Sequence, residues 1–181
     1  MANNKRTWDA AAKAGLVLGG VSSAYFALNS LLSTYGAGRI GNIGSTLIIL
    51  VLWGFKFYLC IALLKRFMQQ FAAQDDSVTN GDTLRLGICT ALLSSLVYSA
   101  VYLAWVLFIQ PDIFVNAMQS VAATLPAEAL SQMQDMIGKL PQYTFWANLI
   151  YCFLFGTVLS VILSRNIPSQ NPFESQEEDA Q

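Results

Sequence analysis

The sequence predicts an all-α fold: an integral membrane four-helix bundle with a short extracytoplasmic two-helix segment between helices three and four. Hydrophobic residues make up 55% of the chain and charged residues only 12%, about half the share found in an ordinary soluble domain. The apolar residues gather in four long runs, and none of these runs contains Asp or Glu. Such a composition is typical of helices that face lipid.

The four runs define the spans of one membrane domain, residues 1–165. An α-helix needs about 20 mostly apolar residues to cross the hydrocarbon core of a bilayer. A soluble core helix is shorter, and a surface helix carries a polar face, so neither alternative accounts for these runs. The predicted spans are residues 14–34, 43–64, 86–109 and 145–163.

Residues 110–144 form the longest segment outside the spans and predict two short amphipathic helices. Apolar residues recur at helical spacing on both sides of Pro126, and Pro141 ends the pattern. Two roles are open for these helices: they cap the bundle or lie on the outer leaflet, or they form a docking surface for a membrane-protein partner. The remaining residues, 166–181, are polar and acidic and predict a disordered cytoplasmic tail.

The basic residues predict that the N-terminus and the C-terminus are both cytoplasmic. Lys and Arg in short loops resist translocation and therefore concentrate on the cytoplasmic side of a multi-pass membrane protein. With the N-terminus inside, only Arg39 and Lys139 fall on the opposite side. The expected cytoplasmic set is Lys5, Arg6, Lys13, Lys65, Arg66, Arg85 and Arg165.

Composition also disfavours several classes of function. The net charge is −1, so no basic excess neutralises phosphates, and no nucleic-acid partner is expected. The chain has no histidine, which is the commonest general base and transition-metal ligand. Its three cysteines, Cys60, Cys89 and Cys152, lie in apolar runs without the spacing of metal ligands. We therefore expect no cofactor, no metal and no catalytic residue.

Small residues recur at every fourth position in three of the spans. Helices in a bilayer associate by close approach of their backbones across such stripes, because apolar burial gives no net drive there. The first stripe has two interpretations: packing within the monomer, or a homodimer through span one. The expected helix-packing residues are Gly15, Gly19 and Ser23 in the first span, Gly87, Ala91 and Ser95 in the third, and Gly156 and Ser160 in the fourth.

Lys56 is the one charged residue inside a span. A charge near the bilayer centre costs about 2.5–3.5 kcal/mol on insertion scales, so it needs protein, water or a lipid head group around it. Counting about 1.5 Å per residue from the inner ends places Lys56 about 12 Å deep. The hypothetical ligand-binding layer at this depth consists of Lys56, Ser22, Ser23, Ser94, Ser95 and Thr157.

Three interpretations of Lys56 follow. The side chain extends along its apolar stem towards Lys65 and Arg66 at the inner surface. Alternatively, it binds an anion or an anionic membrane lipid. A Ser/Lys dyad with a serine of the same layer would make the protein a membrane-embedded hydrolase, but serine is also an ordinary residue of helix interfaces.

The sequence resembles a family of bacterial four-helix membrane proteins catalogued as domain-of-unknown-function family 4199. The resemblance rests on Gly81, Arg85 and Gly87 at the entry to span three, and on Gln110-Pro111-Asp112 at its end before the two-helix outer segment. It covers roughly residues 7–165. It implies the four-span topology and a bacterial cytoplasmic (inner) membrane, and it implies no activity and no site residues.

These observations favour a non-enzymatic inner-membrane protein that acts through helix–helix association with itself or with a membrane partner. The alternative is a small carrier or an anionic-lipid-binding protein that uses Lys56. The position of the Lys56 side chain separates the two functions, because only the alternative requires it to face an enclosed polar space.

Overall fold

The computed structural model describes residues 4–35, 37–74, 78–112 and 138–167. These residues form four long helices and no strand: α1 (Asn4–Tyr35), α2 (Ala37–Ala72), α3 (Asn80–Phe108) and α6 (Leu140–Arg165). All four are long and apolar enough to cross a membrane. The predicted all-α four-helix membrane fold is therefore confirmed. Most of the predicted outer segment and nearly all of the predicted tail lie outside the described residues.

The helices are longer than the apolar runs from which the spans were predicted. Residues 37–42, expected in a loop, are the first turns of α2, and residues 140–144, expected in the outer segment, begin α6. Pro141 lies in the first turn of α6 and thus starts a helix where the sequence pattern suggested an end. Proline is tolerated there because the first turn needs no amide donor from it.

A capping box fixes the start of α3, six residues before the predicted span. The Thr79 side chain accepts a hydrogen bond from the backbone N–H of Asp82, at 3.3 Å. In return, the Asp82 carboxylate accepts one from the backbone N–H of Thr79, at 3.2 Å. Two amide groups at the helix end are satisfied in this way, so the helix begins in the polar residues ahead of the apolar run.

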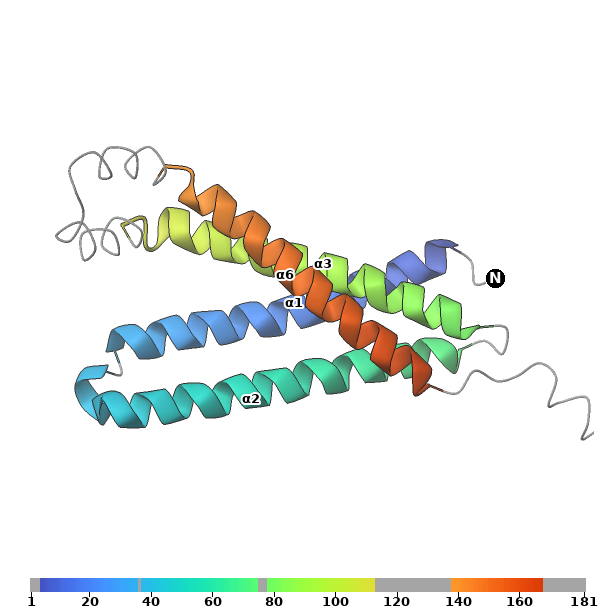
Figure 1. Cartoon of the computed structure of the whole chain (residues 1–181), viewed down its shortest axis with the longest axis horizontal. Helices are drawn as coiled ribbons and strands as arrows, with labels where there is room; N and C mark the ends of the chain where they lie inside the picture. Colours follow the sequence, from blue (N-terminus) through green and yellow to red (C-terminus); the bar gives the residue numbers. More distant parts are fainter. Residues whose placement is uncertain (1–3, 36, 75–77, 113–137, 168–181) are drawn as a thin grey trace, which may run out of the picture.

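The helices alternate in direction, and α3 is the central one (Figure 1). It packs against both α1 and α6, whereas α2 packs mainly against α1 and has little contact with α3 and α6. In Figure 1, α6 crosses α3 obliquely and approaches α2 at the end of the bundle where α1 begins and α6 ends. We call this the terminal end of the bundle.

Buried apolar side chains form a hydrophobic cluster at the terminal end. All four helices contribute to it, so this is where α2 is attached to the rest of the bundle. Met68 of α2 is fully buried there, against the backbone of α3. Buried members of the cluster include Ala11 of α1, Leu64, Met68 and Phe71 of α2, Leu86 of α3 and Leu163 of α6.

Candidate ligand site at Lys56

The small-residue stripe of α1 faces α3 of the same chain. A methyl group added at Gly15 would lie 2.7 Å from Cβ of Leu93, and one added at Gly19 would lie 2.8 Å from Cβ of Val97. Neither position has room for a side chain. The next residue of the stripe, Ser23, donates its hydroxyl to the Gly19 carbonyl at 2.8 Å, which satisfies it within α1. Since α3 covers this face, a homodimer would have to use another surface.

The stripes of α3 and α6 face each other. A methyl group at Gly87 would lie 2.6 Å from Cβ of Ser160, and one at Gly156 would lie 2.7 Å from Cβ of Ala91. The buried Ser160 hydroxyl donates to the Gly156 carbonyl at 2.7 Å. Ser95, also buried, donates to the Leu92 carbonyl at 2.8 Å. These hydroxyls therefore pack in the interface without needing a partner on the opposite helix.

No such stripe draws α2 towards α3 and α6, and a cavity of about 200 Å³ lies between the four helices. Around Gly54 of α2 there is no atom within 4 Å of the position of an added methyl group. The cavity has a polar side and an aromatic side. Its polar lining consists of Lys56 and Cys60 of α2, Ser22 of α1, Ser94 of α3 and Cys152 of α6.

Lys56 lies inside the bundle, with its ammonium group over two aromatic rings. Its Nζ is 5.3 Å from the ring centroid of Tyr25 and 5.7 Å from that of Tyr98. The side chain therefore does not take the predicted route towards Lys65 and Arg66. The Cα–Cβ bond of a helical residue tilts towards the helix N-terminus. For α2 this direction leads away from the terminal end.

The two rings offset part of the cost of the charge. A cation–π contact is worth about 0.5–1 kcal/mol at an exposed site and about 2 kcal/mol when it is desolvated, and Lys56 makes two such contacts. Together they are comparable to the cost of about 2.5–3.5 kcal/mol for a lysine at this depth. Among the described residues no carboxylate pairs with Lys56, and the four predicted spans contain none. The Lys56 side chain thus contacts both rings and also lines the cavity.

The structure brings together part of the predicted polar layer. Ser22 and Ser94 line the cavity with Lys56. Ser23 and Ser95 do not, because their hydroxyls turn back to carbonyl groups of their own helices. Thr157 is also absent from the lining, and its hydroxyl oxygen is buried without a hydrogen-bond partner in the described structure.

The geometry gives no support to a Ser/Lys dyad. The Ser94 hydroxyl donates to the Ala91 carbonyl at 3.2 Å, and the Ser22 Oγ lies 4.0 Å from the Cys60 Sγ. Within the described part of the chain, neither serine is hydrogen-bonded to Lys56. A lysine that serves as general base must reach the hydroxyl whose proton it takes. In the described geometry, neither serine is therefore placed for this role.

Sequence reasoning missed the aromatic side of the cavity. Trp53 stacks on Phe57 with ring centroids 5.7 Å apart, and Phe57 meets Phe155 of α6 at 5.6 Å. Tyr151 continues this row along α6, 6.5 Å from Phe155. The signal was present in the sequence, since Trp53 and Phe57, and likewise Tyr151 and Phe155, are four residues apart and share a helix face. It did not show that the two pairs face each other.

Four apolar membrane-spanning helices around a cavity with a single cation define the chain as a multi-pass membrane protein with a candidate ligand site in its membrane core. The family described as "protein of unknown function (DUF4199)" matches residues 13–165. The chain belongs to this family, which confirms the resemblance in its sequence. No curated protein and no solved structure matches the chain.

Proposed function

We propose that the protein is a non-enzymatic binder of an anionic membrane amphiphile, whose acidic group pairs with Lys56. One observation carries this proposal: Lys56 lines a cavity between helices and does not lie along the lipid surface. A charge in this position is a functional-site hypothesis by default, because a purely structural interior has no use for it. The hydroxyls of Ser22 and Ser94 supply additional polar contacts on the same lining.

The mouth of the cavity favours entry from the bilayer. Trp53 of α2 and Tyr151 of α6 both line the cavity and are 56% and 70% exposed on the lipid-facing surface. The cavity, at about 200 Å³, is smaller than a typical drug-sized pocket of about 300–1,000 Å³. It is suited to the head group and the first part of a chain, with the rest of the tail in lipid. A fatty acid has this shape.

Trp53 offers a direct test, because it lines the cavity. In a variant whose other tryptophans are replaced by phenylalanine, dibromostearate should quench Trp53 fluorescence at lower concentration than its uncharged methyl ester. Lys56→Met keeps the apolar stem and removes the charge, so it should reduce quenching by the acid to the level of the ester. Lys56→Arg should retain part of the difference.

Two results would overturn the proposal. Equal quenching by acid and ester in the unmodified site would show that the lysine does not select a charge. Equal quenching of the Lys56→Met variant and its parent by the acid would show that the selectivity, if present, comes from elsewhere. The purified Lys56→Met protein should also carry less acidic lipid from its native membrane, at an unchanged protein level.

We also propose a location in a bacterial cytoplasmic membrane, with both termini inside. The exposed basic residues Lys65, Arg66, Arg85 and Arg165 support this orientation, because all of them lie at the terminal end, on or beside the helices described above. A cysteine introduced at Ser175 should react with a membrane-impermeant maleimide only after the cells are opened. Reaction in intact cells would reverse the orientation.

Association with itself or with a membrane partner is the second candidate function. It is favoured by α2, which packs mainly on α1 and leaves large apolar side chains on its outer side, among them Leu50 and Tyr58. Leu50→Trp should disrupt such a complex in mild detergent, whereas Leu28→Trp on the exposed side of α1 should not. A monomer in native membrane would dismiss this candidate.

A further inference from the structure

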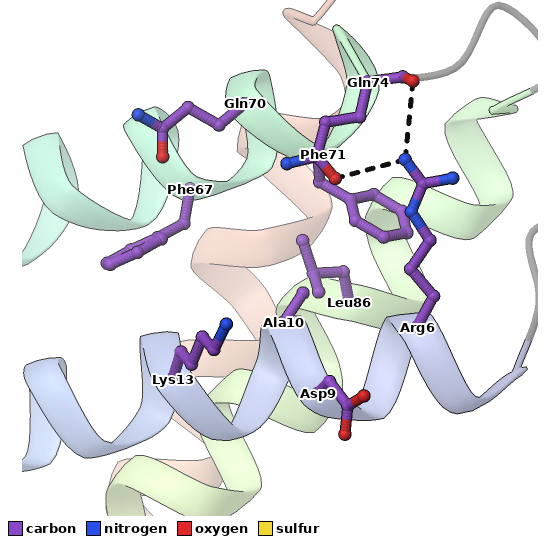
Figure 2. A pocket seen from close by; sticks show the side chains of 9 residues that line it. All are labelled: Arg6, Asp9, Ala10, Lys13, Phe67, Gln70, Phe71, Gln74 and Leu86. Atoms are coloured by element: carbon purple, nitrogen blue, oxygen red, sulfur yellow. Dashed lines mark hydrogen bonds between the residues drawn. The ribbon is translucent and has the colours of Figure 1, made fainter.

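A second cavity, of about 240 Å³, lies at the terminal end between the start of α1 and the end of α2. Figure 2 shows its side chains. Arg6 and Lys13 of α1 extend towards α2, where Gln70 and Gln74 face them. The floor is apolar and includes Phe71 and Leu86, both almost fully buried. We call this cavity the terminal groove.

The terminal groove carries a net positive charge on the side that faces α2. Arg6 is held in place by hydrogen bonds from Nη2 to the carbonyl and the side-chain oxygen of Gln74, at 3.4 and 3.2 Å. Lys13 lies two turns further along α1, on the same side of that helix. Asp9 also lines the groove, but its carboxylate points away from α2 in Figure 2. Two cations from one helix face thus line the groove above an apolar floor, Arg6 at the end beside Gln74 and Lys13 at the other end, on the side of Phe67 (Figure 2).

Its position along the helices matches the level of lipid head groups. The apolar run of α1 begins at Ala14, immediately after Lys13. Trp8, close to Arg6 in the sequence, is half exposed, as is usual for tryptophan at a membrane–water interface. A basic cluster beside the end of a membrane span attracts anionic lipids by about 1 kcal/mol per charge.

We propose that the terminal groove binds the phosphate of an anionic phospholipid from the adjacent leaflet. Arg6 and Lys13 attract the phosphate from the two ends of the groove, the carboxamide of Gln70 adds a neutral donor, and the apolar floor accommodates the glycerol and the first acyl carbons. An anionic head group suits two cations better than a zwitterionic one, which brings its own positive charge into the groove. This site is separate from the cavity at Lys56.

The test uses the full chain, delipidated in mild detergent, and native mass spectrometry with phosphatidylglycerol, phosphatidylcholine and inorganic phosphate as probes. Phosphatidylglycerol should bind more tightly than phosphatidylcholine. Replacing both Arg6 and Lys13 by Gln should weaken phosphatidylglycerol binding by about tenfold or more, given about 1 kcal/mol per charge. The charge-conserving pair, Arg6→Lys with Lys13→Arg, should keep most of the affinity and shows that the loss is not due to misfolding.

Lys65→Gln with Arg66→Gln is the matched control, because it removes one lysine and one arginine at the same end of the bundle and outside the groove. An equal loss of phosphatidylglycerol affinity in this control would show that the lipid is attracted by the basic surface in general and does not bind in the groove. Displacement of the lipid by inorganic phosphate at similar concentration would make it a site for a free anion. A groove variant that loses stability but retains the lipid would assign the two cations to contacts within the chain.

Discussion

The α1–α3–α6 side of the bundle and the α2 side are built on different rules. Where α1 and α6 meet α3, glycine and serine remove the side chains that would hold the backbones apart, and the glycines of these interfaces have no room for an added methyl group. Where α2 meets the others, contact is made by large side chains such as Leu64 and Met68 near the terminal end. Beyond that end α2 stays apart from α3 and α6, and the cavity at Lys56 lies in the gap.

This difference explains why the site lies beside α2. A close-packed interface of small residues cannot hold a ligand without being forced open. An interface fixed at one end by large residues keeps space beyond that point. In lipid, where apolar burial does not draw helices together, such a separation costs little because lipid tails fill the outer part of the gap. The close-packed interfaces and the candidate ligand cavity thus lie on different sides of the bundle.

The largest expected effect comes from breaking the α1–α3 interface with Gly19→Leu. A Cβ at this position would lie within 3.1 Å of the Val97 side chain and the Ser94 carbonyl, and leucine adds three further carbons. The helices must separate, so the free energy of unfolding should fall by at least about 3 kcal/mol in a titration with a denaturing detergent. Gly20→Leu is the control, because an added methyl group there meets no atom within 4 Å. Equal losses in both would show that α1 is not packed through its small-residue stripe.

Met68→Ala tests the attachment of α2. Met68 is fully buried in the cluster at the terminal end, and its Cε approaches the position of an added methyl group at Gly87 to 3.4 Å. Truncation should cost about 2 kcal/mol, the lower end of the usual range, because α2 can move to close part of the space. The same titration applies, and Leu50→Ala on the exposed side of α2 should change the free energy of unfolding little. A neutral Met68→Ala would mean that α2 is held by α1 alone.

The sequence predicted the four helices well and the positions of their ends less well. Hydropathy located all four helices, because the cost of polar groups in lipid acts residue by residue along the chain. It placed their ends too far inside, because the ends are set by caps such as Thr79 and by tolerance of Pro141 in a first turn. Both features concern backbone hydrogen bonding at helix ends in water, which hydropathy does not describe.

For the candidate site, depth was predictable and direction was not. A rise of about 1.5 Å per residue placed Lys56 level with Ser22 and Ser94, and the structure brings these three into one cavity. Which of two neighbouring serines faces inward depends on the rotation of each helix, which the partner helix fixes. The route of the Lys56 side chain was open to prediction, since the Cα–Cβ tilt of α2 directs it towards Tyr25 and Tyr98.

Gly87→Ala is a finer test of the α3–α6 interface. The added methyl group would approach both Cβ and Oγ of Ser160 to 2.6 Å, so one helix must shift. The cost of overpacking, about 1–3 kcal/mol, is partly offset by the gain of about 1 kcal/mol from replacing glycine in a helix. A net loss of about 1 kcal/mol in the free energy of unfolding is expected. Gly54→Ala, on the open side of α2, should be neutral or stabilising. A larger loss for Gly54→Ala than for Gly87→Ala would contradict the difference in packing between the α2 side and the α3–α6 interface.

The smallest expected effect concerns the contact of Lys56 with the Tyr98 ring across the open side of the bundle. Lys56→Met alone should change the free energy of unfolding little in ligand-free detergent, because the cost of the charge, about 2.5–3.5 kcal/mol, and two cation–π contacts of about 0.5–2 kcal/mol each are lost together. Tyr98→Leu alone removes one ring and leaves the charge, so it should be destabilising.

Tyr98→Leu also removes the edge contact of Tyr98 with Phe26, whose ring centroid lies 6.4 Å away. A double-mutant cycle separates the two losses. Tyr98→Leu removes the Phe26 contact whether residue 56 is Lys or Met, so this loss cancels in the cycle. The coupling between Lys56 and Tyr98 should then be about 0.5–1 kcal/mol in favour of the native pair. A coupling of zero would mean that the ammonium turns away from the ring in solution, and the cavity would then lack the preorganised cation on which the proposed ligand binding depends.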